Sequence, residues 1–363
     1  MFPIVLGSAA TLFGATYLVR RSLSGPSLKK YDATPALFRD ADPNSDGLKT
    51  VNAYLVENFI KPAQAANAST GWESKRERFE NAGLARTDLK AEYRDDWIEV
   101  EGRKIHGRWT LVDGYDPDRR ILYYHGGAFT VGSDVSHRPI TVNLAKRTGC
   151  AIFTPNYRLM PENKRADAIA DARAAYHWIL DNGPDGPSPV KSLGVAGDSA
   201  GGNLTLMIAN YAKANALRPA DAIFALSPSA DSTASSPTFK QNLETDLMLQ
   251  PLLRPLVKVP RTLLLLGMKK SINMKPSDPD VSPIFADLSD LPPILVQASA
   301  SEMLYGDAVR YVNKANAEGS NATLQAWSNM PHVFQIFDDV LPEAHEALDA
   351  AADFFKTHGV AKP

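Results

Sequence analysis

The residues best suited to chemistry lie in the pentapeptide Gly197-Asp-Ser199-Ala-Gly201. It follows the short apolar run Ser192 to Ala196 and opens a helical stretch. A serine nucleophile on a strand-to-helix turn needs a strained backbone with close neighbours, so small residues are required two positions before and after it. Gly197 and Gly201 meet that requirement. The pattern predicts that Ser199 is a catalytic nucleophile, the alternative being a tight structural turn.

A second motif, His125-Gly-Gly-Ala-Phe129, follows another strand-like run. Glycines let the backbone approach a ligand closely, so the N–H groups of Gly126 and Gly127 are candidates to bind an oxygen that becomes negative during a reaction. The N–H of Ala200 would join them, because a helix N-terminus favours negative charge. We therefore predict an oxyanion hole formed by Gly126, Gly127 and Ala200, with His125 holding the loop and taking no part in proton transfer.

The elements that must position these motifs alternate along the chain. Helical stretches such as Asp167 to Leu180 and Gly201 to Ala214 separate short apolar runs, which indicates crossover connections and a mostly parallel sheet. Ligands of such sheets lie at the carboxyl ends of the strands. We predict an α/β fold with an eight-stranded, mostly parallel sheet flanked by helices. The predicted strands are Trp97 to Val100, Gly107 to Val112, Ile121 to Tyr124, Ala151 to Pro155, Ser192 to Ala196, Ala222 to Leu226, Ile294 to Gln297 and Thr323 to Trp327.

Three further motifs make the chain similar to a known family. They are Tyr157-Arg-Leu-Met-Pro-Glu162, Ser282-Pro-Ile-Phe-Ala-Asp287 with Leu291-Pro-Pro293, and Met330-Pro-His-Val-Phe334. With the glycine loop and the serine motif, they cover residues 95 to 355 in the order typical of the hormone-sensitive-lipase-like branch of the α/β-hydrolases. The chain resembles this branch, which implies an α/β-hydrolase fold with a helical cap and carboxylesterase or lipase activity.

The resemblance implies two partners for Ser199. His332 lies in a loop after the last predicted strand and would take the serine proton, since a hydroxyl is almost un-ionised at neutral pH. Glu302 follows the seventh predicted strand, where the family more often has Asp before Pro-Leu. It would orient the ring of His332 and stabilise the imidazolium. Asp307 is the alternative acid.

Other residues of the motifs have supporting or open roles. Asp198 accompanies the nucleophile as part of its motif. Phe129 and Phe334 stand beside the glycine loop and the histidine, where they either line the substrate pocket or belong to the core. Ala128 replaces the third glycine of the family's loop, which should alter the space for the acyl or alcohol part of a substrate. Asn163-Lys-Arg-Ala-Asp-Ala168 replaces the family's P-F-P-A-A and is expected to affect local packing.

The same resemblance divides the chain into segments. Residues 93–360 are predicted to form the catalytic domain. Residues 22–92 are predicted to form helices ahead of the sheet. Residues 230–280 are predicted to be an insertion, because the connection there is too long for a simple loop. Both would form a cap over the acyl and alcohol pockets. Residues 1–21 would be a membrane anchor or signal-like segment.

The first 19 residues contain no charged side chain and are followed by Arg20 and Arg21. Their length matches one bilayer-crossing helix, which needs about 20 mainly apolar residues. By the positive-inside rule, the arginines would keep the following chain in the cytoplasm. We expect a membrane-anchored protein with a cytoplasmic catalytic domain. The alternatives are a cleaved signal peptide and an amphipathic helix packed on a soluble cytoplasmic protein.

The composition excludes several classes of function. The 363 residues include 39 basic and 41 acidic ones, so no overall positive charge favours binding to nucleic acid. Cys150 is the single cysteine, which excludes an internal disulfide and a cysteine-based zinc site. The sequence has no metal-ligand spacing, no P-loop and no G-x-G-x-x-G after a strand, so neither a metal nor a cofactor is expected.

Together these patterns predict a serine hydrolase that cleaves short- to medium-chain acyl esters in two acyl-transfer steps. Hydrolysis of amides, carbamates or lactones, or deacetylation of sterols or aryl amides, is the alternative on the same triad. The third hypothesis is a receptor that binds a ligand without catalysis, because fold alone does not decide function. The expected partner is a small-molecule ester, and a homodimer through an edge strand or a helix is compatible with the sequence.

Overall fold

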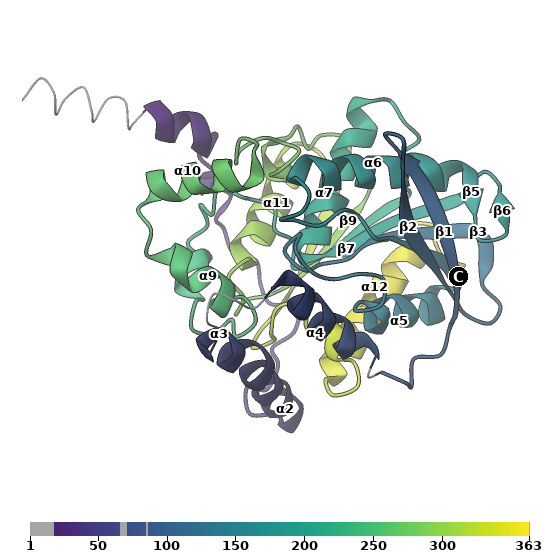
Figure 1. Cartoon of the computed structure of the whole chain (residues 1–363), viewed down its shortest axis with the longest axis horizontal. Coiled ribbons are helices and arrows are strands. Elements are labelled where there is room, and N and C mark those ends of the chain that lie inside the picture. Colours follow the sequence, from purple (N-terminus) through teal and green to yellow (C-terminus); the bar gives the residue numbers. More distant parts are fainter. Residues whose placement is uncertain (1–17, 66–70, 85, 363) are drawn as a thin grey trace, which may run out of the picture.

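The computed structural model describes residues 18–65, 71–84 and 86–362. Its centre is an eight-stranded sheet in the order β1-β2-β4-β3-β7-β8-β9-β10 (Figure 1). β2 is antiparallel to both of its neighbours, and every other adjacent pair is parallel. The predicted fold class is confirmed, and each predicted strand is present. The strands are β1 (Glu92–Val100), β2 (Arg103–Leu111), β3 (Asp116–Tyr124), β4 (Cys150–Pro155), β7 (Ser192–Asp198), β8 (Ala222–Leu226), β9 (Ile294–Ser299) and β10 (Ala322–Trp327), with a separate pair β5 (Asn182–Gly183) and β6 (Gly186–Pro187).

Helices cover both faces of the sheet because its strands are apolar on both sides. In β3, Ile121 and Tyr123 pack in one core cluster, whereas Leu122 and Tyr124 pack in the other. Successive side chains of a strand point to opposite faces, so one continuous apolar run supplies both cores. The helices that flank the sheet are α5 (Arg138–Thr148) and α12 (Pro342–Thr357) on one face and α6 (Arg165–Asp181), α7 (Ser199–Ala214) and α11 (Tyr305–Ala317) on the other.

Two groups of shorter helices lie together at one end of the molecule, away from β5 and β6 (Figure 1). One comes from the N-terminal segment and the other from the insertion after β8, and α9 packs on α3 where the groups meet. These helices are α2 (Asp46–Leu55), a π-helix (Val56–Ile60), α3 (Lys61–Ala65) and α4 (Trp72–Leu84), then α8 (Thr238–Gln241), α9 (Gln250–Val257) and α10 (Arg261–Ile272); short 3-10 helices span Lys29–Tyr31, Pro283–Phe285 and Phe334–Phe337.

A third core cluster joins α2 to the loop after β10. Leu48, Val51 and Leu55 of α2 are buried beside Trp327 and Phe334. The N-terminal helical segment therefore packs against the part of the chain that carries His332.

The predicted membrane anchor, Met1 to Val19, lies outside the described residues except for its last two positions. Within the described ranges, no helix is both long and apolar enough to span a bilayer. The structure thus adds no support to the anchor.

The antiparallel edge of the sheet is tightly packed around Gly107, and a substitution there tests this packing. A Cβ atom at this position of β2 would lie 2.1 Å from Cζ of Phe153, whose ring is buried between Trp109 and Trp178. We predict that Gly107→Ala lowers the free energy of unfolding by about 1–3 kcal/mol, measured by urea denaturation, because overpacking forces a shift of the ring or the strand. Gly267→Ala is the control, since a Cβ there meets nothing within 4 Å. Equal stability of the two variants would contradict this account of the packing.

Candidate active site

Ser199 occupies a strained turn between the buried strand β7 and helix α7. Its φ is +52°, a left-handed conformation that residues with a side chain rarely adopt. A Cβ at Gly201 would lie 1.9 Å from the carbonyl oxygen of Tyr124, and one at Gly197 would lie 2.5 Å from the same atom. Both glycines are therefore required by the close passage of β3, as the sequence motif predicted.

Ser199, His332 and Glu302 form one hydrogen-bonded chain. Nε2 of His332 lies 2.9 Å from Oγ of Ser199, and Nδ1 lies 2.5 Å from Oε2 of Glu302. His332 is 2% exposed and Glu302 is fully buried, whereas Ser199 is partly accessible. The other carboxylate oxygen of Glu302 accepts the N–H of Ser299 at 2.9 Å, which fixes its orientation. The three predicted residues are thus brought together from three separate loops.

The carboxylate of Glu302 raises the pKa of His332. Burial alone would lower the pKa of this ring, but the hydrogen bond and the charge of Glu302, with a smaller effect of Asp246, raise it above the usual value of 6.5. Asp307, the alternative acid, instead accepts the N–H of Asp231 at 3.0 Å. The structure gives His332 only Glu302 as a carboxylate hydrogen-bond partner among the described residues.

The glycine loop requires one correction. Gly126 was expected to supply an oxyanion donor, but its N–H donates to Oδ1 of Asp198 at 3.0 Å. Gly127 and Ala128 follow with φ of +110° and +52°, and within the described part of the chain their N–H groups have no hydrogen-bond acceptor. The N–H of Ala200 lies in the first turn of α7, where helices leave donors unpaired. In these two motifs, the described N–H groups without an acceptor therefore include those of Gly127, Ala128 and Ala200.

Asp198 connects the glycine loop to the nucleophile turn. Besides the N–H of Gly126, this buried carboxylate accepts the hydroxyl of Tyr123 at 2.7 Å and lies 3.3 Å from Nε2 of His137. Burial opposes both charges, yet the pKa of Asp198 stays below its usual value and that of His137 above, because each stabilises the other's charge. The sequence predicted Asp198 only as part of the serine motif. In the structure, its carboxylate links the glycine loop to the turn at Ser199.

His125 lies at the start of the glycine loop, in contact with Tyr157. It is fully buried, and burial lowers its pKa to about 3, so the ring is neutral at physiological pH. The ring stacks on Tyr157 at 4.2 Å, and the hydroxyl of Tyr157 donates to the carbonyl oxygen of His125 at 2.7 Å. No hydrogen bond joins His125 to Ser199 among the described residues.

The insertion supplies residues that the sequence did not identify. Polar side chains of residues 242–246 bond the backbone of the loop that carries Glu302, and Asp246 is itself buried. The only signal in the sequence was a carboxylate directly before an apolar run, which does not indicate a partner. These bonds join Asn242 Nδ2 to Ala300 O (2.8 Å) and Glu302 O (2.9 Å), Thr245 Oγ1 to Ser301 O (2.7 Å), and Met303 N to Asp246 Oδ2 (2.8 Å).

The two candidate pocket phenylalanines have different places. Phe334 is fully buried and packs 5.2 Å from the ring of Trp327, so it belongs to the core, one of the two places that the sequence left open. Phe129 is half-buried, with the guanidinium of Arg165 3.4 Å from its ring centroid. Arg165 also donates to Oδ1 of Asn203, one turn beyond Ser199. This buried arginine stands in the segment where the sequence departs from the family.

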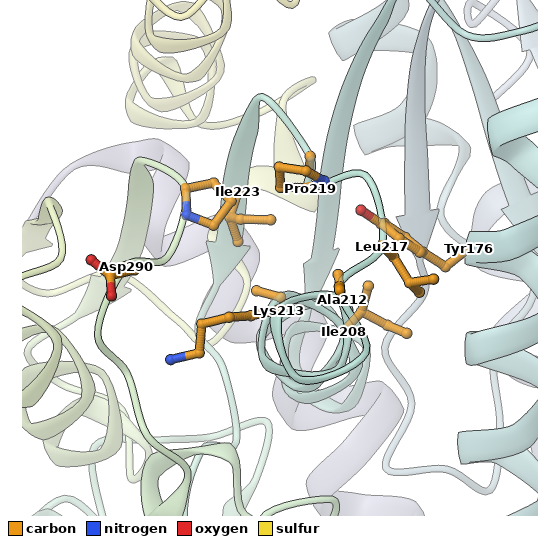
Figure 2. Close-up of a pocket in the computed structure, with 12 residues that line it drawn as sticks. Tyr176, Ile208, Ala212, Lys213, Leu217, Pro219, Ile223 and Asp290 are labelled. Atoms are coloured by element: carbon orange, nitrogen blue, oxygen red, sulfur yellow. The ribbon is translucent and has the colours of Figure 1, made fainter.

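A pocket of about 160 Å³ lies elsewhere, between the last turns of α7 and the amino ends of β8 and β9 (Figure 2). Its lining includes Ile208, Lys213, Ile223 and Asp290. Lys213 and Ser199 are at opposite ends of one helix, about 20 Å apart at 1.5 Å per residue. This pocket is therefore separate from the hydrogen-bonded chain of Ser199.

Comparisons with known proteins agree with this geometry. The family model for the alpha/beta hydrolase fold matches residues 121–336. An acetyl-hydrolase of Streptomyces hygroscopicus is 31% identical over 66% of this chain and 76% of its own length. An esterase of Acinetobacter venetianus is 32% identical over 64% of this chain and 73% of its own.

Solved structures extend the likeness to most of the chain. The crystal structure of an esterase from the bacterial hormone-sensitive lipase family superimposes with a TM-score of 0.72 and 29% identity, covering 87% of this chain and 99% of the esterase. The predicted fold and enzyme class, a carboxylic ester hydrolase, are thereby confirmed. The chain belongs to the α/β hydrolase fold family, within its hormone-sensitive-lipase-like branch.

Proposed function

We propose that Ser199, His332 and Glu302 form the catalytic triad of an esterase that works through an acyl-enzyme. The observation that carries this proposal is the continuous hydrogen-bonded chain from Oγ of Ser199 to the carboxylate of Glu302. A buried acid that bonds Nδ1 leaves Nε2 as the proton acceptor facing the serine. Ser199 is the accessible end of this chain, so a substrate carbonyl meets the nucleophile first.

In the first step, Oγ of Ser199 attacks the ester carbonyl and Nε2 of His332 takes the hydroxyl proton. The tetrahedral intermediate collapses, and His332 returns that proton to the leaving alcohol. Water then repeats the sequence on the acyl-enzyme and releases the acid. Glu302 stays ionised and stabilises the imidazolium in both steps.

The oxyanion hole that we propose consists of the N–H groups of Gly127, Ala128 and Ala200. This set replaces the one expected from the sequence, because Asp198 holds the N–H of Gly126. Gly127 and Ala128 both have a positive φ, so the backbone there follows neither a strand nor a right-handed helix, and the two N–H groups are not used by regular secondary structure. One such donor is worth about 3 kcal/mol in a transition state, so the loop matters as much as the base.

The substrate class is a short- to medium-chain acyl ester bound under the two cap segments, residues 22–92 and 230–280. Two contacts support a cap that belongs to the site. Arg76 of α4 donates to the carbonyl oxygen of Thr130 at 2.9 Å, just after the glycine loop. Asp246 of the insertion accepts the N–H next to Glu302. The acetyl-hydrolase relative supports a small acyl group.

Loss of the nucleophile tests the triad. We predict that Ser199→Ala lowers kcat for p-nitrophenyl butyrate by at least about 10⁴-fold, because no other group can form the acyl-enzyme. Ser271→Ala, at an exposed serine of α10, should retain wild-type activity. Substantial activity in a folded Ser199→Ala protein, with folding checked by circular dichroism, would refute the assignment.

The pH dependence tests the role of His332. Because its folded pKa is raised, the ring loses its proton only above pH 6.5, and kcat/KM should rise with pH through a midpoint above that value. Glu302→Gln removes the main cause of this rise, so the midpoint should move to lower pH while activity at high pH falls by about 10³-fold or more. A midpoint that is unchanged in Glu302→Gln would show that another group titrates.

A pair of loop variants tests the oxyanion hole. In Gly127→Ala, the new Cβ would lie 2.1 Å from the carbonyl oxygen of Val131 at an unfavourable φ, so the loop must shift. We predict a loss of about 10²–10³-fold in kcat with little change in KM. Ala128→Gly keeps the N–H and relieves a left-handed alanine, so its kcat should stay within a few-fold of wild type. Equal effects of the two variants would contradict the proposed donor set.

Substrate preference needs a direct measurement. With p-nitrophenol as the fixed alcohol, we expect kcat/KM to peak between acetyl and octanoyl esters and to be low for palmitoyl. The amide p-nitroacetanilide should be hydrolysed far more slowly than p-nitrophenyl acetate. A peak at palmitoyl would indicate a lipase, and comparable rates on the amide would favour the alternative class of substrate.

A further inference from the structure

The insertion after β8 has a charge pattern unlike the rest of the chain. Between Asp246 and Asp278 there are six basic residues and no acidic one, although the whole protein has a net charge of −2. This stretch contains α9 and α10. It is therefore a strongly basic region, whereas the rest of the chain has 33 basic and 41 acidic residues.

Exposed leucines accompany this charge. Leu252 of α9 is 54% exposed, and Leu263 and Leu266 of α10 are 60% and 42% exposed. Leu264 and Leu265 form the buried side of α10. Two leucines of the helix therefore pack against the protein. Leu263 and Leu266, three residues apart, lie on one face that is exposed to solvent.

Exposed lysines accompany these leucines in α10 and just after α9, and Lys269 and Lys270 lie one helical turn after Leu266. Lys258, Lys269 and Lys270 are exposed, and none forms a salt bridge with another described residue. By contrast, Arg254 of the same insertion is paired with Glu244 at 2.6 Å. We use the term cap face for the six exposed residues Leu252, Lys258, Leu263, Leu266, Lys269 and Lys270.

A second segment adds the same chemistry beside the cap face. Residues 18–24 form a helix that lies next to α10 (Figure 1), and its exposed side chains include Leu18, Arg20 and Arg21. Burial lowers the pKa of Arg261 in α10, and the charge of Arg20 lowers it further, so the two cations are close. Basic and apolar groups from two distant parts of the sequence are therefore gathered at one end of the molecule.

From this combination we infer that the cap face docks on the surface of an anionic phospholipid bilayer. Surface helices bind lipid through exposed apolar side chains in the headgroup region and through basic side chains that contact the phosphates. The positive charge of the cap face favours an anionic partner, and its exposed leucines favour a partner with an apolar interior. Docking would set the cap, and with it the entrance to the site, next to esters dissolved in the membrane. The inference does not depend on which residues carry the reaction.

Vesicle flotation of the full-length protein tests this inference. Wild type should float with vesicles of phosphatidylcholine and phosphatidylglycerol, and less with phosphatidylcholine alone. Each basic residue near an anionic surface strengthens binding about fivefold, so replacing Lys258, Lys269 and Lys270 with Gln should weaken binding at least tenfold. The leucine variant Leu263→Ser/Leu266→Ser should also weaken binding, and added salt should act on wild type in the same direction.

A charge-matched control distinguishes the cap face from net charge. Replacing Lys90, Lys104 and Lys146 with Gln removes as many exposed positive charges elsewhere and should leave binding near wild type. All variants should give the circular dichroism spectrum and melting temperature of wild type, which shows that they are folded.

Two results would overturn the inference. The first is equal flotation of the cap-face lysine variant and wild type. In that case, other parts of the chain would be responsible for any binding to vesicles. The second is a concentration-dependent dimer that the same variants abolish without vesicles, which would make the cap face a contact between copies.

Discussion

The left-handed turn at Ser199 is the constraint on which the site depends. At φ +52°, the chain leaves β7 and enters α7 within one residue, which aims Oγ out of the sheet toward His332. Because β3 passes close to this turn, only glycine fits two positions before and two positions after Ser199. The same turn places the N–H of Ala200 in the first turn of a 16-residue helix, so one backbone feature sets both the proposed nucleophile and a proposed oxyanion donor.

Two buried polar networks hold the other parts of the site against this turn. On one side, the carboxylate of Asp198 bonds the glycine loop, Tyr123 and His137. On the other, the insertion bonds the loop of Glu302 through Asn242 and Asp246. Removing one partner of a buried ion pair typically costs about 3–5 kcal/mol, so loss of either Asp198 or His137 should weaken the packing of the glycine loop.

The sequence predicted the strands, and brought forward the residues of the proposed triad, but it did not predict the groups that support them. All the main strands were expected, because continuous apolar runs between helical stretches are a local signal. Ser199, His332 and Glu302 were found through motifs at the ends of those strands. The acceptor of the Gly126 N–H could not be found in this way, since Asp198 is 72 residues away and meets it only through the pairing of β3 with β7. The burial of Phe334 likewise depends on α2, which packs there from far along the chain.

Covalent labelling tests the central claim, that Ser199 is the nucleophile activated by His332 and Glu302. After reaction of the full-length protein with a fluorophosphonate, peptide mapping by mass spectrometry should place a single adduct on Ser199. Labelling should be far slower in His332→Ala, because the base that takes the serine proton is gone. An adduct on another residue, or labelling of Ser199 at the same rate without His332, would contradict the account.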